Sequence, residues 1–333
     1  MKQIKLVIVG FGMIGRALAR TLVEKHGVIK KISGSDLTVV GICEKKGSII
    51  DESGINLDDV MEIPREDLKK HSKWTSKTSL EIIGKTDCNI LLELTPGNIE
   101  TGEPGLTHIQ KALENGIHVV TSNKAPLAIK FSQLNDLAIK NNVKLLYEAT
   151  VGGAIPVINM YKKNLRVNKI ESIHGILNGT SNFVLCKMAE ENVTLEIALK
   201  EAQELGIAEW NPDYDIKGID TAVKVVILAN SLMEKNVSFR DIRITGIDEI
   251  TPETIELAKN HNKVIKLIGD VSNLEVSPRL IPINHPLNVN GTLNAIMFNT
   301  DVAGDITIIG RGAGPRETSS SIMSDILEII PII

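Results

Sequence analysis

An acidic loop followed by a lysine is the stretch of the sequence best suited to proton chemistry. Glu209 and Asp215 lie in the loop, which leads into an apolar run of helical character at 222–228. Asp220 and Lys224 are four residues apart, so on a helix they share one face, one turn apart. The valines beside the lysine disfavour its charge and the aspartate favours it, so the amine can both donate and accept a proton. An ordinary salt bridge beside a solvated loop is the alternative interpretation.

A glycine-rich turn near the start of the chain has the pattern of a dinucleotide site. Residues 4–9 (IKLVIV) predict a buried strand, and the glycines Gly10, Gly12 and Gly15 follow it directly as G-F-G-M-I-G. A helix is predicted after the turn, with Gly27 as its C-cap. The first glycine permits the tight turn, the second lets the backbone approach a pyrophosphate, and the third lets the helix pack on the strand. The helix N-terminus supplies free N–H groups for the phosphates.

The residues after the second predicted strand leave the choice of cofactor open. The strand covers 37–43 and is followed by Glu44, Lys45 and Lys46. A carboxylate at this place binds a ribose 2′-hydroxyl, as in NAD, whereas basic side chains bind the 2′-phosphate of NADP. Both are present here. Residues 28–36 lengthen the usual spacing from the glycines and are interpreted as an insertion.

Strands and helices alternate through the first 150 residues. This alternation predicts a Rossmann-type, doubly wound parallel sheet in an α/β fold. Residues 47–88 are polar and are expected to be irregular with helical patches. The predicted strands after them cover 89–94, 118–121 and 144–150, and the predicted helices cover 104–115 and 131–141.

Polar residues follow two of these strands. Thr95 comes after one strand, and Asn123 and Lys124 come after the next. Ligands of parallel sheets gather at the carboxyl ends of the strands, so we expect these side chains to contact a ligand. A solvated loop lysine is the alternative for Lys124.

The second half of the chain predicts a different kind of domain. Short alternating strand patterns at 264–310, broken by Pro and Asn, indicate an antiparallel sheet with helices on one side. A second glycine-rich turn, ending at Gly314, precedes a last helix and suggests that the chain returns to the first domain. We therefore expect a nucleotide-binding domain at 1–150 with a return at 305–333, and an α+β substrate-binding and dimerisation domain at 151–304.

The loop between the two predicted domains is rich in small residues. It runs from Glu148 to Pro156 as EATVGGAIP. Such a loop leaves backbone carbonyls unpaired, and a hard cation binds carbonyl oxygens. A close-packed hinge between the domains is the alternative.

Composition excludes several classes of function. A net charge of −4 without a basic stripe argues against nucleic-acid binding, and no apolar run reaches the roughly 18 residues of a membrane span. The start is too short for a signal peptide. The cysteines Cys43, Cys88 and Cys186 lack metal-ligand spacing, which favours a reducing cytoplasm. Cys88 has no evident base, and the scattered histidines predict no catalytic triad.

Together these segments resemble homoserine dehydrogenases over nearly the whole chain. The resemblance implies reduction of L-aspartate 4-semialdehyde to L-homoserine with NADPH or NADH, on the route to threonine and methionine. The chain ends without the regulatory ACT domain or the kinase domain of many relatives, so we expect no threonine inhibition through such a domain. The matching blocks are VGFGMIG (9–15), SNKAPL (122–127), YEATVGGAIPVI (147–158), GILNGTSNFVL (175–185), GIAEWNPDYDIKGIDTAVK (206–224) and GRGAGPRET (310–318).

The resemblance also implies roles for single residues. Lys224 is similar to the family's proton donor and acceptor, Lys124 to a second active-site lysine, and Asp220 to a substrate-side aspartate. A homodimer joined through the second domain is implied as well. The implied substrate-binding residues are Glu209, Asp215, Thr180 and Gly179; the cofactor-binding residues are Gly10, Gly12, Met13, Ile14, Gly15, Glu44, Lys45, Thr95, Lys124 and Gly314; and the ligands of a sodium ion are Glu148, Val151, Gly153 and Ile155.

Two other functions fit parts of the pattern. One is a two-domain NAD(P) oxidoreductase acting on a different amino-acid aldehyde or imine, which would keep the glycines and the lysine but use the acidic loop differently. The other is a nucleotide-sensing protein without catalysis, which would not need the acid–lysine arrangement. Turnover with a panel of substrates separates the three.

Overall fold

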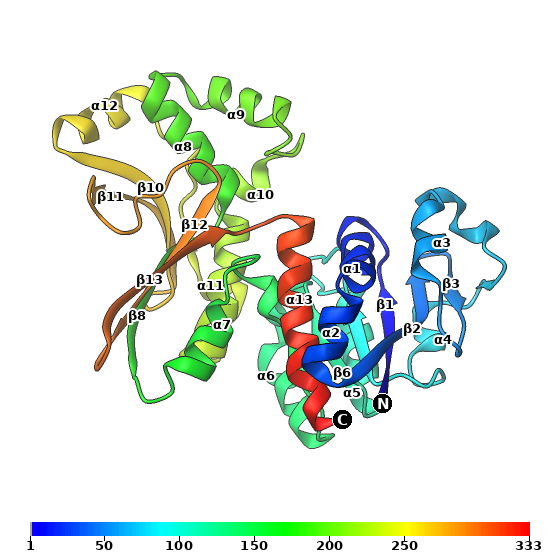
Figure 1. The fold of residues 1–333 in the computed structure, drawn as a ribbon. Helices are drawn as coiled ribbons and strands as arrows, with labels where there is room; N and C mark the ends of the chain where they lie inside the picture. Colours follow the sequence, from blue (N-terminus) through cyan, green and yellow to red (C-terminus); the bar gives the residue numbers. More distant parts are fainter. Residues whose placement is uncertain (1) are drawn as a thin grey trace. The chain divides into compact units, whose positions relative to one another are not determined.

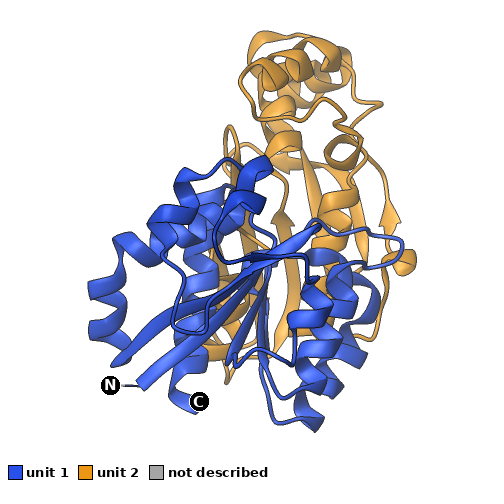
Figure 2. Cartoon of the chain, turned by 90° about the vertical axis from the view of Figure 1, so that its right-hand side faces the viewer, with its two compact units in different colours: residues 1–150, 314–333 blue, residues 151–313 orange. Residues whose placement is uncertain are grey.

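The computed structural model describes residues 2–333, which form two compact units (Figure 2). Unit 1 comprises the chain up to Thr150 together with Gly314–Ile333, and unit 2 comprises Val151–Ala313. The chain therefore leaves unit 1, builds the whole of unit 2, and then comes back to complete unit 1.

Unit 1 is organised around a sheet that is parallel except at one edge. Among the described residues the sheet has seven strands in the order β4-β3-β2-β1-β5-β6-β7. The run from β2 to β7 pairs in parallel, whereas β3 pairs antiparallel with β2 and β4 antiparallel with β3. The central strands are aliphatic because helices cover both faces of such a sheet. The strands are β1 (Lys2–Val9), β2 (Ser35–Glu44), β3 (Gly47–Ile50), β4 (Trp74–Thr75), β5 (Ile90–Glu93), β6 (His118–Thr121) and β7 (Leu145–Leu146).

The last helix of the chain completes the core of unit 1. Helix α13 lies beside α1 (Figure 1) and buries Ile322, Ile326 and Ile329 in the same cluster as Leu18 of α1 and Ile8 of β1. Each fully buried aliphatic side chain contributes about 1.5–3 kcal/mol to stability. The helices of unit 1 are α1 (Met13–Glu24), α2 (His26–Ser33), α3 (Leu57–Glu62), α4 (Ser79–Ile82), α5 (Gly105–Glu114), α6 (Lys124–Lys140) and α13 (Pro315–Ile329), with short helical turns at Arg65–Lys70, Glu148–Thr150 and Ile330–Ile332.

Unit 2 is organised around a largely antiparallel sheet. Its order within the described chain is β13-β12-β8-β10-β11-β9, and only the short β9 runs parallel to its neighbour β11. A mixed α/β fold with a Rossmann-like domain and a second sheet domain is thus confirmed. The strands are β8 (Ile170–Ile176), β9 (Arg243–Ile244), β10 (Lys263–Asp270), β11 (Glu275–Pro282), β12 (Leu293–Thr300) and β13 (Gly304–Arg311).

Helix α11 is the most deeply buried element of unit 2. It packs on β10 and β11, and its residues from Asp220 to Asn230 are all buried. A helix that is apolar nearly all round belongs in a core, so each polar group on it needs a partner there. The helices of unit 2 are α7 (Val157–Asn159), α8 (Gly179–Glu191), α9 (Leu195–Glu204), α10 (Asp213–Ile216), α11 (Ile219–Leu232) and α12 (Pro252–Asn260), with helical turns at Met160–Asn164 and Phe239–Asp241.

The return to unit 1 starts later than residue 305. The segment 304–311 is β13, which pairs along its whole length with β12 in the sheet of unit 2. Residues 305–313 therefore belong to unit 2, and Gly314 is the first residue of the return. The strand pattern at Ile306–Ile309 was predicted, but its partner strand could not be read from local sequence.

Two predictions in the first half were wrong in their local structure. Gly27 is not a C-cap: it lies inside α2, an additional helix that ends at the left-handed Gly34, with φ of 66°. The supposed insertion is therefore mostly this helix, which buries Ile29. Residues 47–88 contain β3 and β4 as well as helical turns, because the short apolar run Gly47–Ile50 pairs with β2.

Residues 122–126, which follow the predicted strand 118–121, include the start of a helix. Helix α6 begins at Lys124 rather than near 131, and the side chain of Asn123 caps it by accepting the Ala125 N–H at 3.2 Å. A local kink at Lys130 separates this first part from the predicted helix. Lys124 is consequently held on a capped helix rather than in a mobile loop.

Candidate active site

The glycine turn of unit 1 has the shape required to accept a dinucleotide. Gly10 has φ of 96°, and a Cβ there would come within 2.9 Å of the Leu94 carbonyl. A Cβ on Gly15 would overlap the carbonyl oxygen of Gly10, so only glycine lets α1 pack this closely on the turn. By contrast, a Cβ on Gly12 would meet only the Arg65 guanidinium, at 3.7 Å. The space over Gly12 is thus open in the protein itself, as the approach of a pyrophosphate requires.

The start of α1 presents the remaining features of this site. Gly12 is the N-cap of α1, and no acidic side chain lies in its first turn. The N-terminus of this helix therefore keeps its partial positive charge for an anion. Met13 is 80% exposed and Ile14 is half-buried, so both are at the surface of the turn.

Glu44 is held at the glycine turn by two contacts. Its Oε1 accepts the backbone N–H of Phe11 at 2.7 Å, and its Oε2 binds the Arg65 guanidinium at 3.0 Å. Lys45 and Lys46 are exposed. Arg65 was not singled out from the sequence, because its helical turn is far from the glycines along the chain and comes back to Gly12 only in the fold.

The ends of β5 and β6 bring two predicted residues together. The Thr95 hydroxyl lies 3.4 Å from the side-chain amide of Asn123, the N-cap of α6. Lys124 is the first residue of α6 and is half-buried. Two parallel strands thus end in one hydrogen-bonded group, in the region of a doubly wound sheet where ligands bind.

Lys224 of unit 2 is a buried amine with two strong partners. It is 6% exposed, and its Nζ lies 2.7 Å from Asp220 Oδ2 and donates to the Leu177 carbonyl at 2.5 Å. The pairing predicted from the four-residue spacing is present on α11. The alternative was an ordinary salt bridge beside a solvated loop: the pair itself is buried, with Asp220 only 5% exposed, whereas Glu209 in the loop is exposed. A desolvated ion pair of this kind needs good geometry to be stable.

Asn178 links this pair to a second carboxylate. Its Nδ2 donates to Asp215 Oδ1 at 2.6 Å and to Asp220 Oδ2 at 2.9 Å, while its Oδ1 accepts the Ser181 N–H as the cap of α8. In the sequence, the segment 178–182 offers only the capping chemistry of a helix start. The bridging role of Asn178 was missed because Asp215 and Asp220 are remote from it along the chain.

Burial perturbs the carboxyl group of Asp215. Loss of hydration raises its pKa above the ordinary value, and the negative charge of Asp220 adds to the effect. Hydrogen bonds from Asn178 and Thr180 and the charge of Lys224 act in the opposite direction but do not cancel it. A carboxylate in this situation gains from any cation that approaches it.

The other predicted substrate residues differ in their surroundings. Thr180 is buried in the first turn of α8 and donates to the Ile207 carbonyl at 3.3 Å. Gly179 approaches the Thr292 backbone so closely that a Cβ would lie 2.7 Å from its oxygen. Glu209 is exposed, and only its backbone carbonyl is engaged, by Gln203. The structure brings Thr180 close to the Lys224 group through Asp215 but leaves the Glu209 side chain in solvent.

The small-residue loop has the backbone of a tight turn. Gly152 and Gly153 have φ of 86° and 56°, and the Ile155 N–H closes the turn on the Gly152 carbonyl at 2.8 Å. The Ile155 carbonyl accepts the Val157 N–H, Val151 is buried, and the Glu148 N–H donates to Asp325 at 2.9 Å. Across residues 2–333 there is no group of three His, Cys, Asp or Glu side chains that could hold a metal ion. Any cation here would depend on carbonyl oxygens.

The remaining residues to consider are a glycine and two thiols. Gly314, with φ of 129°, is the N-cap of α13, where a Cβ would overlap the Glu317 carboxylate. Burial raises the pKa of Cys43 to about 11 and that of Cys88 to about 12. Thiols of this kind stay protonated at neutral pH and are poor nucleophiles. This agrees with the expectation that Cys88 does not attack a carbonyl.

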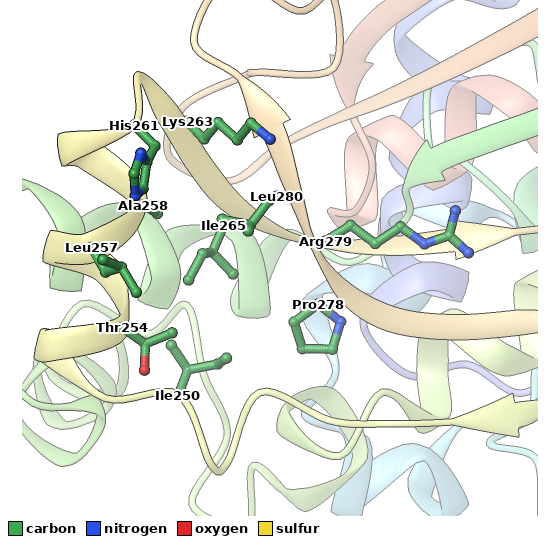
Figure 3. A pocket seen from close by; sticks show the side chains of 10 residues that line it. All are labelled: Ile250, Thr254, Leu257, Ala258, His261, Lys263, Ile265, Pro278, Arg279 and Leu280. Atoms are coloured by element: carbon green, nitrogen blue, oxygen red, sulfur yellow. The ribbon is translucent and has the colours of Figure 1, made fainter.

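A separate pocket lies between α12 and the strands β10 and β11. Figure 3 shows Leu257, Ile265 and Leu280 in its wall, with the Arg279 guanidinium pointing away from the other side chains. None of the residues that line it belongs to the candidate site. We assign it no part in the chemistry.

Comparison with known families decides which enzyme these features belong to. The family model described as "Homoserine dehydrogenase" matches residues 156–327, and the one described as "Homoserine dehydrogenase, NAD binding domain" matches residues 10–148. The chain belongs to the homoserine dehydrogenase family. It is accordingly an NAD(P)-dependent oxidoreductase, as the resemblance implied.

Relatives match the chain over almost its full length. The homoserine dehydrogenase of Methanocaldococcus jannaschii is 46% identical over 97% of this chain and 98% of its own. An NAD(+)-dependent homoserine dehydrogenase of Pseudomonas canavaninivorans is 36% identical over 99% and 97%. A hyperthermophilic archaeal homoserine dehydrogenase in complex with NADPH is 31% identical with a TM-score of 0.86, covering 99% of this chain and 98% of that one.

A solved structure from Archaeoglobus fulgidus is similar at 43% identity, with a TM-score of 0.90 over 98% of this chain and 99% of that one. Such a score at this identity extends the likeness to both units of the homoserine dehydrogenase fold. In the described part of the chain, no helix combines the length and the apolar character needed to cross a bilayer.

Proposed function

We propose that Lys224 donates the proton when this enzyme reduces L-aspartate 4-semialdehyde to L-homoserine, and accepts it in the reverse reaction. The observation that carries the proposal is the buried ion pair of Lys224 and Asp220, joined through Asn178 to Asp215. A bound nicotinamide supplies the hydride in the reduction and accepts it in the oxidation.

The proposed role follows from where charge develops in the reaction. When the aldehyde carbon gains a hydride, its oxygen becomes an alkoxide, and a nearby ammonium both stabilises that charge and neutralises it by giving up a proton. Asp220 holds the Lys224 amine at 2.7 Å, which restricts the position of the amine before the reaction begins. We assign Lys124, fixed in the first turn of α6, as a second amine that stabilises the alkoxide.

The carboxylates are proposed to select the substrate. Both substrate and product carry an α-ammonium group, which an acidic side chain can pair with. Asp215, with its raised pKa, gains from such a cation, and we assign the exposed Glu209 to the same group. Thr180 and Gly179 at the start of α8 complete the proposed substrate-binding set.

For the cofactor we propose that NADP is accepted as well as NAD. Arg65, Lys45 and Lys46 offer positive charge for a 2′-phosphate, and Arg65 lies next to Gly12. Both carboxylate oxygens of Glu44 already form hydrogen bonds, one with the Phe11 N–H and one with Arg65. Glu44 is therefore less available to bind a free ribose 2′-hydroxyl. The glycine turn, Met13, Ile14, Thr95 and Gly314 are the other assigned contacts.

Three further assignments extend the proposal by resemblance to the family. They are a sodium ion held mainly by backbone carbonyls of the loop at Glu148, Val151, Gly153 and Ile155, a homodimer formed through unit 2, and a cytoplasmic location. The left-handed glycines of the loop support the first, since such a turn can direct neighbouring carbonyls outward.

The test of the main proposal compares two lysines that each pair with an aspartate four residues away. The pair of Lys224 is buried, and the other pair is exposed. Lys224→Ala should lower kcat for homoserine oxidation by about 10²–10⁴-fold, the usual contribution of a positioned proton-transfer group. The Kd for NADPH should stay nearly unchanged, because the glycine turn is untouched. Steady-state assays with NAD and NADP separately, together with NADPH titration, measure both quantities.

The matched control is Lys217→Ala. Lys217 also pairs with an aspartate four residues away, Asp213, at 2.8 Å, but both side chains are exposed. Its replacement should leave turnover close to wild type, because exposed pairs contribute little. Near-normal kcat in Lys224→Ala, or an equal loss in Lys217→Ala, would refute the assignment.

A further inference from the structure

A fully buried carboxylate lies beneath the cofactor side of unit 1. Glu93, the last residue of β5, has an exposed fraction of 0%. Its Oε1 accepts both the backbone N–H of Thr95, at 3.0 Å, and the Thr95 hydroxyl. A buried carboxylate is expensive unless it is paired and hydrogen-bonded, so a residue of this kind at a strand end needs an explanation.

The second carboxylate oxygen of Glu93 is held by a histidine. His108 of α5, which is 5% exposed, lies with Nδ1 2.8 Å from Glu93 Oε2 and with Nε2 2.6 Å from the Ser79 hydroxyl. A serine hydroxyl can either donate or accept, so it satisfies both protonation states of the ring. The chain Ser79–His108–Glu93 therefore fixes the orientation of the carboxylate from behind.

The groups that Glu93 holds belong to the loops assigned to the cofactor. The Thr95 hydroxyl accepts a hydrogen bond from the side-chain amide of Asn123. Asn123 in turn caps α6, which begins at Lys124. The Glu93 backbone carbonyl also accepts the Thr121 hydroxyl, at 2.9 Å, which itself accepts the Asn123 N–H. One residue thus controls the ends of both β5 and β6.

The same geometry argues against a nucleophilic serine. Ser79 starts a helix of only four residues, α4, and its neighbours Thr78 and Glu81 are engaged in a capping box. The Ser79 hydroxyl is bonded to His108 Nε2, and the other ring nitrogen of His108 is bonded to the fully buried Glu93. Glu93 accepts from Thr95 on one oxygen and is held by His108 on the other, an arrangement that supports a binding loop from behind.

We propose that Glu93, oriented by His108 and Ser79, is a positioning residue that fixes Thr95 and the start of α6 for binding of the nicotinamide cofactor. The inference rests on the assigned contacts of Thr95 and Lys124 with that cofactor. It adds three residues to the site that neither motif nor spacing indicated, because they come from three separate elements.

The test uses a disruptive and a conservative change of the same residue. His108→Leu removes the donor to Glu93, so the Thr95 loop should shift; KM for NAD(P) should rise about tenfold and kcat should fall by a similar factor, since displacements of about 1 Å can cost up to 10²-fold. KM for homoserine should stay within about twofold, because its assigned carboxylates are in unit 2. His108→Gln, whose amide can still donate, should recover most of the cofactor affinity.

Two additional variants keep the outcome decisive. Ser79→Ala, which leaves the His108–Glu93 contact in place, covers the case in which His108→Leu does not fold. It should raise the cofactor KM by about twofold and lower Tm slightly, because His108 loses one hydrogen-bond partner. Thr95→Val should reproduce the increase in cofactor KM in part, because it removes the hydroxyl that donates to Glu93 and keeps the backbone N–H.

Parallel increases in KM for cofactor and homoserine, or a folded His108→Leu with normal cofactor kinetics, would overturn the inference. So would a normal cofactor KM in Thr95→Val, which would separate the loop from the cofactor. None of these results would touch the role of Lys224, whose test measures turnover in unit 2 variants.

Discussion

The candidate residues of unit 1 and those of unit 2 rely on different components of the polypeptide. Unit 1 offers mainly backbone for the phosphates, at the open face of Gly12 and the N-terminus of α1, and adds the side chains of Thr95 and Lys124 at the strand ends. Unit 2 offers side chains: Lys224 and Asp220 on a buried helix, joined by Asn178 to Asp215. A backbone site tolerates change in most side chains but not in its glycines, whereas a side-chain site depends on every charge that it buries.

The largest effect expected from breaking the backbone site is that of Gly12→Ala. The methyl group fits the protein, because its only neighbour is Arg65 at 3.7 Å, but it fills the space that the pyrophosphate needs. We expect KM and Kd for NAD(P) to rise by about tenfold or more, which corresponds to about 1.4 kcal/mol of binding free energy. KM for homoserine should be unchanged.

The matched control for this change is Gly27→Ala. A Cβ on Gly27 meets nothing within 4 Å, and the residue lies inside α2. Alanine there should increase the free energy of unfolding by about 0.5–1 kcal/mol and leave the kinetics alone. If Gly12→Ala left cofactor binding as it is in wild type, the backbone site would be misassigned.

On the side of unit 2, Glu209→Ala should raise KM for homoserine by about tenfold, the loss of one charge-assisted hydrogen bond. The cofactor KM should not move. Glu204→Ala, which removes an equally exposed carboxylate at the end of α9, serves as the control. An unchanged homoserine KM in Glu209→Ala would remove that residue from substrate binding and restrict the role to Asp215.

Asp215→Asn is expected to have the smallest effect of these variants. It should stabilise the folded protein at pH 7 but weaken homoserine binding. Because the pKa of Asp215 is raised in the folded protein, its contribution to stability is present below about pH 4, the unfolded value, and is lost as pH rises through the folded pKa. The asparagine keeps an acceptor for Asn178 without the charge. Tm should therefore rise at pH 7 and not at pH 4, while homoserine KM increases.

Thermal unfolding of wild type and Asp215→Asn at several pH values measures this directly. A Tm that falls at pH 7 would mean that the Lys224 charge stabilises the Asp215 carboxylate more than burial destabilises it. The comparison between the units would then need revision, since unit 2 would gain rather than lose stability from its acidic group.

The contrast between the units also explains what the sequence could predict. The turn at Gly10–Gly15 and the pairing of Asp220 with Lys224 are local patterns, in which a few residues fix the geometry. Asn178 was visible only as a helix cap, because its two carboxylate partners are brought to it by the packing of α8 against α10 and by α11.

Non-local pairing accounts for most of the other differences. The strands β3 and β4 are too short for a clear alternation, and β13 could not be assigned to a sheet without knowing its partner β12. Likewise, Ser79, His108 and Glu93 form one hydrogen-bonded chain from three elements. A histidine that is isolated in the sequence can therefore still take part in a hydrogen-bonded chain in the fold.

The placement of α13 has a consequence for how the protein is made. Its buried side chains belong to the core of the unit that emerges first from the ribosome, yet they are translated after all of unit 2. The amino-terminal sheet must therefore wait, with part of its apolar surface uncovered, while an entire second domain is synthesised. Early termination of translation would thus leave the core of unit 1, the first domain to be synthesised, incomplete.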